Sequence, residues 1–256
     1  DIKKIAPNII INDRLDTNEA YIKELKNQYF KVINFEDLGK GCEYADSVFN
    51  AIYPEKNALP NHYFGQEYFI LRDEFILSEE KIVTSEVKNI LITFGGVDPN
   101  NYTEKIIRTI NQYCIEKNIA ITIIAGFGYA NYDSIKGYKN VMIKGNISNI
   151  SDYMLHADLI FTSAGRTVYE VASIGTPAVV LAQNEREMTH FFASPEYGFS
   201  NLGLGYEVSN ENIMFEFLSL VNSFEKRKHM SNLMKKQDLK SGRTRVHKLI
   251  QDLIQG

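Results

Sequence analysis

The chain has 256 residues, of which 44% are hydrophobic and 23% are charged, and its formal net charge is −4. At the usual ~100–200 residues per domain, this length allows one large or two modest hydrophobic cores. The mildly acidic balance argues against a surface that binds nucleic acid or an anionic membrane, and no apolar run approaches the ~18–20 residues that would span a bilayer.

The first part of the chain alternates between strand and helix patterns. Short apolar runs predict buried parallel strands at residues 8–13, 30–35 and 45–50. A helical stretch lies between the first two, at residues 19–28, and the irregular segment 57–86 indicates a domain junction. We therefore expect a partial N-terminal Rossmann-like domain at residues 1–85, because a complete nucleotide-binding half usually has more strands.

From residue 86 onward the pattern becomes regular. Apolar runs predict strands at residues 89–94, 120–125, 141–144, 159–162 and 178–181. Helices are expected between them, at residues 102–114, 150–157 and 168–174. This alternation is typical of a doubly wound α/β sheet, so residues 86–256 are expected to form a C-terminal Rossmann-like domain. Charge runs at residues 225–228 and 235–236 are expected to be solvated helix faces.

The first candidate binding loop spans residues 94–101, between a predicted strand and a predicted helix. Gly95 and Gly96 have no Cβ atom, so their backbone amides can approach a ligand closely. The start of the following helix offers unpaired N–H groups to an anion. Alternatively, the loop is a tight turn in which Asp98 or Asn101 caps the helix. The sequence leaves both readings open.

The second candidate loop, residues 162–167, also leads from a strand into a helix. Its small side chains, hydroxyls and amides suit phosphate oxygens, and the helix dipole has the right direction. The residues expected to contact the phosphates are Ser163, Ala164, Gly165, Arg166 and Thr167. One turn later, the Glu170 carboxylate could accept hydrogen bonds from ribose hydroxyls. The alternative is that Ser163 only caps the helix and Glu170 is only a first-turn acid.

The third candidate loop follows the strand at residues 178–181. Ligands of open α/β sheets lie beyond the carboxyl ends of the strands, so polar side chains there could reach a sugar or a phosphate. The residues concerned are Gln183, Asn184 and Glu185, and a solvated loop is a comparable alternative. Gly126, which follows the strand at residues 120–125, is assigned to the same substrate-binding set.

Other kinds of chemistry find little support. His190 is the best imidazole candidate for a general base, although a structural role is favoured. The two cysteines, Cys42 and Cys114, have no CxxC partner, which fits a reducing cytoplasm, and no histidine or cysteine spacing suits a metal. Walker A, Gly-x-Gly-x-x-Gly and Gly-x-Ser-x-Gly patterns are absent. We therefore expect a cytoplasmic protein without a metal or a cofactor.

The three loops together resemble landmarks of the PseG/SpsG family, whose members are UDP-sugar hydrolases related to MurG. Residues 92–101 resemble the family's Gly-Gly-Asp-Asn loop, residues 157–170 its segment from Ala-Asp to Glu, and residues 182–185 its Asn-Glu loop. Further landmarks match upstream, at residues 34–37, 45–46 and 68–75. The resemblance runs through essentially the whole chain.

The resemblance implies a GT-B-like fold, in which two Rossmann-like domains flank the active site, and UDP or a UDP-sugar as the ligand. It also implies hydrolysis of UDP-2,4-diacetamido-2,4,6-trideoxy-β-L-altropyranose to UDP and the free sugar, on the way to pseudaminic acid. The positions that match the family's nucleotide site are Gly95, Gly96, Ser163, Gly165 and Glu170.

The sequence departs from the family at two points. The family's assisting histidine lies in an N-terminal Gly-rich loop, and this chain starts at Asp1, after that point. Leu15 stands where the family hydrolases have a tyrosine. We therefore expect a fragment of a longer polypeptide, with a fused or separate domain completing its N-terminal half. A MurG-like glycosyltransferase and a non-catalytic nucleotide-sugar-binding subunit remain as alternatives.

Overall fold

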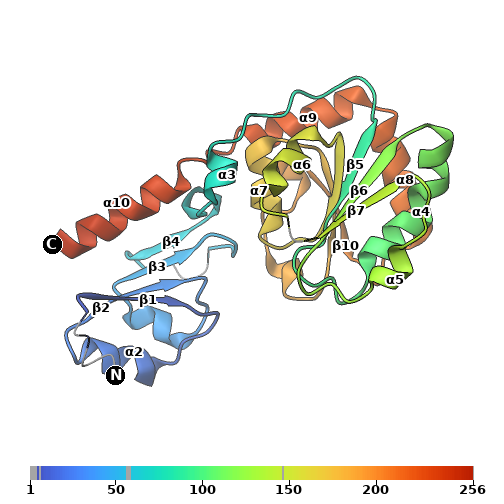
Figure 1. Cartoon of the computed structure of the whole chain (residues 1–256). Coiled ribbons are helices and arrows are strands. Elements are labelled where there is room, and N and C mark those ends of the chain that lie inside the picture. The colour runs from blue at the N-terminus through green and yellow to red at the C-terminus, as the bar shows by residue number, and fades with distance from the viewer. Residues whose placement is uncertain (1–4, 6, 56–58, 146, 256) are drawn as a thin grey trace. The chain divides into compact units, whose positions relative to one another are not determined.

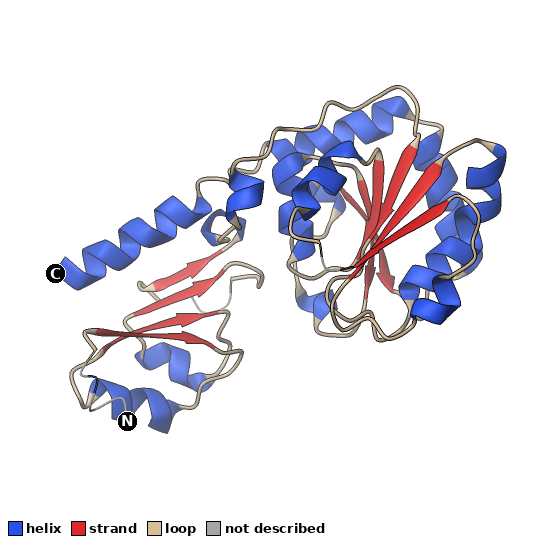
Figure 2. Ribbon diagram, viewed as in Figure 1, coloured by secondary structure: helices blue, strands red, loops and turns tan. Residues whose placement is uncertain are grey.

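The computed structural model describes residues 5, 7–55, 59–145 and 147–255, and the chain divides into two compact units (Figure 1). Unit 1 comprises residues 1–70 and 239–256, and unit 2 comprises residues 71–238. In each unit a parallel β-sheet has helices packed on it. Figure 2 shows the strands in red and the helices in blue.

The described part of unit 1 contains a four-stranded parallel sheet in the order β1-β2-β3-β4. The strands are β1 (Ile9–Asp13), β2 (Lys31–Phe35), β3 (Ser47–Asn50) and β4 (His62–Phe64). The helices are α2 (Glu19–Lys26), the 3₁₀ turns η1 (Lys40–Tyr44) and η2 (Gln66–Tyr68), and α10 (Gly242–Gln255). Ile22 and Leu25 of α2 pack against Val32 in one core cluster, while Val246 of α10 packs against Ile33 and Phe49 in a second. The two clusters lie on opposite faces, because successive strand residues alternate in direction.

Within the described residues, unit 2 contains a six-stranded parallel sheet in the order β10-β9-β8-β5-β6-β7. The strands are β5 (Asn89–Ile92), β6 (Ala120–Ala125), β7 (Val141–Gly145), β8 (Leu159–Thr162), β9 (Ala178–Ala182) and β10 (Phe199–Leu204). Because the strands are parallel, their carboxyl ends share one edge of the sheet. All three candidate binding loops start at that edge.

Helices cover both faces of this sheet. They are α3 (Asp73–Ile76), α4 (Tyr102–Glu116), α5 (Tyr132–Ile135), α6 (Ile150–His156), α7 (Thr167–Ile174), α8 (Asn210–Val221) and α9 (Phe224–Lys235), with the 3₁₀ turns η3 (Glu187–Thr189) and η4 (Pro195–Tyr197). Helix α4 packs against α5 and α8, while α7 packs against α3, α6 and α9. Figure 1 shows α4 and α7 on opposite sides of the sheet.

The regular part of the sequence predicted its elements well. The strands expected at 120–125 and 159–162 coincide with β6 and β8. The segment 57–86 was expected to be irregular, but it contains β4 and α3. No strand was expected at β10, because its run Phe-Ser-Asn-Leu-Gly-Leu mixes polar and apolar residues and contains Gly203 at φ +86°.

The two units differ from the expected domains 1–85 and 86–256 in two places. Residues 71–85 lie in unit 2, where the Lys81 N–H donates to the Ile174 carbonyl at 2.8 Å. Residues 239–256 lie in unit 1, because the apolar side of α10 packs on the sheet of that unit. The sequence of α10 is amphipathic, but the pattern does not reveal which of the two sheets its apolar side covers.

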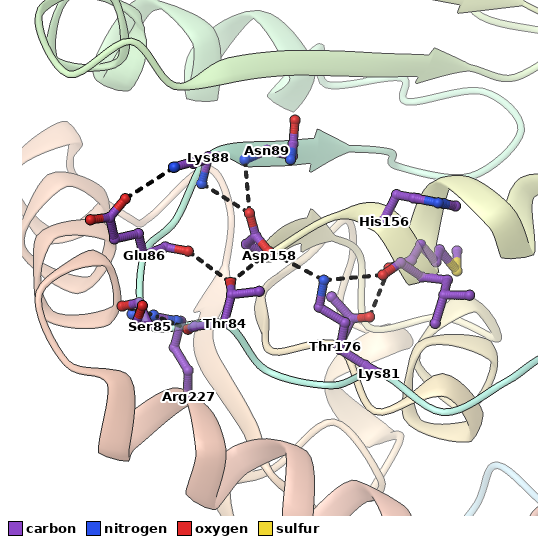
Figure 3. A network of polar contacts seen from close by, with 12 residues as sticks. Lys81, Thr84, Ser85, Glu86, Lys88, Asn89, His156, Asp158, Thr176 and Arg227 are labelled. Carbon is purple, nitrogen blue, oxygen red and sulfur yellow. Dashed lines mark hydrogen bonds and ion pairs between the residues drawn. The ribbon is translucent and has the colours of Figure 1, made fainter.

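A buried carboxylate, Asp158, ties residues 81–89 to the sheet of unit 2 (Figure 3). Its Oδ2 accepts the N–H groups of Lys88 and Asn89 at 2.9 and 3.0 Å. Its Oδ1 accepts the Thr84 hydroxyl at 3.0 Å and pairs with Lys81 Nζ at 3.2 Å. Burial opposes the charged form, but the two N–H groups and Lys81 outweigh it, so the pKa of Asp158 is lowered.

The charge run at residues 225–228 is not simply a solvated face, which corrects the sequence expectation. Arg227 is fully buried, with a relative exposure of 0%. Its guanidinium donates to the carbonyls of Leu220 and Val221 at 2.6 and 3.1 Å, and to those of Thr84 and Ser85 at 2.8 and 2.9 Å. Four carbonyl acceptors at one guanidinium compensate for the loss of water, so a buried cation is tolerated here.

No helix within the described ranges is both long and apolar enough to cross a membrane. The same residues hold no group of three or more His, Cys, Asp or Glu side chains that could bind a metal ion.

We predict that Asp158→Asn lowers the free energy of unfolding by about 3 kcal/mol, because it leaves Lys81 as a buried cation without its counter-charge. A lowered folded-state pKa gives stability that is present above the unfolded pKa and lost as the pH falls. The wild type should therefore lose this contribution below about pH 4, the range of an ordinary Asp pKa. In the variant, the free energy of unfolding should fall less steeply as the pH is lowered through this range. Urea denaturation at several pH values measures both effects.

The matched control is Asp133→Asn, whose side chain is 96% exposed beside Lys136. This control should leave the denaturation midpoint near its wild-type value. Equal midpoints for the wild type and Asp158→Asn would contradict the role given to the buried carboxylate.

Candidate functional site

A pocket of about 330 Å³ lies in unit 2, at the edge where the strands end. It is bounded by the loop after β5, the end of β6, the start of α6 and the first turn of α7. The lining residues are Arg72, Thr93, Gly95, Gly96, Ile124, Ala125, Gly126, Phe127, Ile147, Ile150, Thr167 and Glu170. Five of the residues singled out in the sequence therefore meet at one pocket: Gly95, Gly96, Gly126, Thr167 and Glu170.

The glycines at this pocket have different physical roles. Gly95 has a φ of +75°, which favours glycine, and a Cβ atom on either Gly95 or Gly96 would meet nothing within 4 Å. The space beside these two residues is open for a ligand. A Cβ atom on Gly126 would lie 2.4 Å from the Gly95 carbonyl oxygen. Gly126 therefore lets two loops cross closely, and the Gly128 N–H donates to the Gly96 carbonyl at 2.9 Å.

Asp98 and Asn101 are engaged in contacts within the protein. The buried Asp98 carboxylate accepts the N–H groups of Tyr102 and Thr103 at 2.9 Å each, which satisfies the start of α4. Asn101 donates to Glu104 at 2.6 Å and accepts the Tyr129 hydroxyl at 2.6 Å. Of the two readings that the sequence left open for these side chains, the capping role fits the observed contacts of Asp98.

Glu170 faces Arg72, which lies in the family landmark at residues 68–75 and was not among the expected site residues. Arg72 donates from Nε and Nη2 to Glu170 Oε1 at 3.0 Å each, and its Nη1 lies 2.7 Å from Glu74 Oε1. Glu74 in turn accepts the Ser151 N–H at 3.0 Å. Burial raises the pKa of Glu170, and the Arg72 guanidinium partly opposes the rise. The carboxylate is thus oriented and partly withdrawn from water.

The loop at residues 162–167 lies beside the pocket, with Ser163 and Ala164 buried and Arg166 exposed. The Ala164 N–H donates to Glu187 Oε2 at 3.1 Å. The Gln183 N–H donates to the same oxygen at 2.8 Å. Burial raises the pKa of Glu187, and the two N–H groups oppose the rise. A carboxylate of the chain itself therefore contacts the predicted phosphate loop.

The remaining candidates hold the third loop in place. Gln183 Nε2 donates to the Phe94 carbonyl at 2.9 Å, and Asn184 Oδ1 accepts the Glu187 N–H at 3.0 Å. Glu185 accepts the Tyr206 hydroxyl at 2.8 Å.

His190 contacts the loop at residues 162–167. Its Nδ1 lies 2.9 Å from the Ala164 carbonyl oxygen, which can only accept, so the proton is assigned to Nδ1. Burial lowers the pKa of the imidazole.

Several of the pocket residues were not among those expected at the site from the sequence. Phe127 is 91% exposed at the pocket, and two isoleucines add apolar surface: Ile147, which precedes α6, and Ile150, its first residue. Phe127 lies next to a glycine that was identified, so its position after β6 was the available signal. Arg72 precedes Glu170 by 98 residues, and no spacing rule connects them.

No protein-family model matches the chain. Its sequence is 34% identical over 203 residues to an uncharacterised protein of Methanocaldococcus jannaschii, a match that covers 72% of this chain and 42% of that protein. It is 24% identical over 270 residues to the spore coat polysaccharide biosynthesis protein SpsG of Bacillus subtilis, with 99% and 79% covered. A third relative, 23% identical over 213 residues, is the pseudaminic acid cytidylyltransferase and UDP-2,4-diacetamido-2,4,6-trideoxy-beta-L-altropyranose hydrolase of Helicobacter pylori, with 80% and 38% covered.

The chain thus spans less than half of the Methanocaldococcus jannaschii and Helicobacter pylori proteins. Among solved structures, MurG of Acinetobacter baumannii matches with a TM-score of 0.69 at 15% identity, covering 98% of this chain and 76% of that one. A UDP-GlcNAc 2-epimerase from Neisseria meningitidis bound to UDP-GlcNAc matches with a TM-score of 0.64 at 14% identity, covering 98% and 78%. The fold is therefore α/β and GT-B-like, with two Rossmann-like domains built on parallel sheets.

We predict that Gly126→Ala destabilises unit 2 by about 2 kcal/mol, since the new methyl group would press on the backbone of Gly95 and Gly96. Gly96→Ala is the matched control, because its Cβ atom meets nothing within 4 Å. Thermal denaturation should show a lower midpoint for Gly126→Ala alone. Equal midpoints for the two variants would show that the crossing of the loops is not tight.

Proposed function

We propose that unit 2 binds the uridine diphosphate part of a UDP-sugar in the pocket at the carboxyl ends of its strands. The observation that carries the proposal is the meeting of three kinds of group in one pocket. Gly95 and Gly96 leave open space at a backbone loop, Thr167 lies at the start of α7, and Glu170 presents an oriented carboxylate. The pocket volume of about 330 Å³ lies in the range of ligand sites, roughly 300–1,000 Å³.

Each of these pocket groups is suited to bind one part of the ligand. Phosphate oxygens accept hydrogen bonds from backbone N–H groups and are favoured at the positive end of a helix dipole, which here is the start of α7. The Glu170 carboxylate accepts hydrogen bonds and cannot donate any while ionised, so it suits the two hydroxyls of a ribose. Phe127, Ile147 and Ile150 offer an exposed ring and apolar surface to a planar base.

The relatives favour uridine as the base. The name of the Helicobacter pylori protein includes the hydrolysis of a UDP-sugar, and the Neisseria meningitidis structure contains UDP-GlcNAc. The sequence landmarks of the PseG/SpsG family point to the same class of ligand.

We further propose hydrolysis as the reaction, with UDP-2,4-diacetamido-2,4,6-trideoxy-hexose giving the free sugar and UDP in nonulosonic-acid or surface-polysaccharide biosynthesis. In this reaction water replaces UDP at the anomeric carbon of the sugar. The hydrolase activity in the name of the Helicobacter pylori protein and the name of SpsG, a polysaccharide biosynthesis protein, support this choice. The contribution of unit 2 would be to bind the nucleotide and hold the leaving group.

Transfer of the sugar to an acceptor is the second candidate, which the likeness to the MurG fold favours. Incubation of the chain with the UDP-sugar distinguishes the two reactions through their products. Hydrolysis predicts equal amounts of free reducing sugar and UDP without any added acceptor. Release of UDP only when an acceptor is present would contradict hydrolysis.

We predict that the chain binds UDP with measurable heat in isothermal titration calorimetry, and that it prefers UDP over 2′-deoxy-UDP. Glu170→Ala should weaken UDP binding by about tenfold or more, which corresponds to the roughly 1.5–3 kcal/mol expected for losing a hydrogen bond to a charged group. If Glu170 accepts the ribose hydroxyls, the variant should bind UDP and 2′-deoxy-UDP equally.

Glu116→Ala serves as the charge-matched control, because Glu116 is exposed at the end of α4. This variant should bind UDP like the wild type. An absence of binding at millimolar UDP would refute the proposed ligand. A preference for UDP over 2′-deoxy-UDP that persists in Glu170→Ala would refute the role of Glu170.

A further inference from the structure

The Glu187 carboxylate occupies backbone donors of the kind that an anionic ligand uses. Its Oε2 accepts one N–H from the loop after β8, that of Ala164, and one from the loop after β9, that of Gln183. Its other oxygen, Oε1, lies 3.2 Å from the position that a Cβ atom on Gly165 would take. The side chain therefore lies directly on the loop that precedes α7.

This carboxylate is stabilised by the protein backbone. Across the residues that the structure describes, Glu187 forms no ion pair with a lysine or an arginine. Two peptide N–H groups hold the carboxylate beside the loop that leads into α7, and backbone N–H groups before a helix are typical of a phosphate site. Burial also disfavours its charge, which fits the raised pKa.

The segment that carries Glu187 allows the side chain to leave. Glu187 is the first residue of the short turn η3, and it is only partly buried. Residues 184–186 and 188–189 around it are exposed. Rotation of the side chain into water would therefore free the N–H groups of Ala164 and Gln183 without disturbing a packed core.

We infer that Glu187 is an internal competitor for the anion site formed by the N–H groups of Ala164 and Gln183, and that a ligand phosphate binds there by displacing it. The identity of the ligand as a nucleoside diphosphate rests on the proposed function. The exchange makes Glu187 a specificity-determining residue. A phosphate regains the two hydrogen bonds that Glu187 gives up, whereas a neutral nucleoside or sugar gains nothing from displacing it.

The test measures the affinities of the wild type and Glu187→Gln for UDP, inorganic pyrophosphate and uridine by isothermal titration calorimetry. Glutamine has the same shape but no charge, so it competes less with an anion and does not repel it. We expect Glu187→Gln to bind UDP and pyrophosphate about tenfold more tightly, equivalent to about 1.4 kcal/mol. Its affinity for uridine should be unchanged. Glu196→Gln, an exposed change on η4 with the same loss of charge, should bind all three compounds like the wild type.

The outcomes separate this inference from the proposed function. If the wild type binds UDP and Glu187→Gln binds it equally or more weakly, Glu187 is a fixed support of the loop and the inference is overturned, while UDP binding stands. If the wild type does not bind UDP but Glu187→Gln binds pyrophosphate more tightly, the inference holds and the proposed ligand is wrong. If neither protein binds pyrophosphate or UDP, both are refuted.

Discussion

The parallel direction of the strands in unit 2 is the constraint on which the candidate site depends. Parallel strands place all their carboxyl ends at one edge, and each connection must then cross back to the opposite edge of the sheet before the next strand begins. For this reason the loops after β5, β6 and β8 approach one another although they are far apart in the sequence. The crossing of Gly126 over Gly95 shows how closely two of them pack.

A second consequence concerns charge. Two partly buried carboxylates, Glu170 and Glu187, lie on the first turn of α7 and against the loop before it, and burial raises the pKa of both. Glu170 is balanced by Arg72, whereas Glu187 is held by peptide N–H groups. A ligand phosphate that used the N–H groups of Ala164 and Gln183 would therefore have to replace Glu187 there. Binding would exchange one anion for another. The ligand would be selected by whether it can accept the hydrogen bonds that the Glu187 carboxylate releases.

The sequence predicted the fold class and the loops around the pocket, because hydrophobic runs and glycines are local signals. It could not predict interactions between distant segments. Arg227 looked like part of a solvated charge run, yet it is buried. Its guanidinium donates to the carbonyls of Thr84 and Ser85, which lie more than 140 residues earlier in the chain. Glu187 was not among the expected site residues, because only folding brings it to Ala164. The assignment of Asp98 also needed coordinates, since a cap and a ligand contact use the same residue types.

The most direct test of UDP binding at this pocket is a backbone amide NMR titration of the labelled chain with UDP. Binding at the proposed site predicts saturable chemical shift changes concentrated at Gly95, Gly96 and Thr167, with the β-sheet of unit 1 unaffected. Shift changes that leave those three amides untouched while others saturate would contradict it.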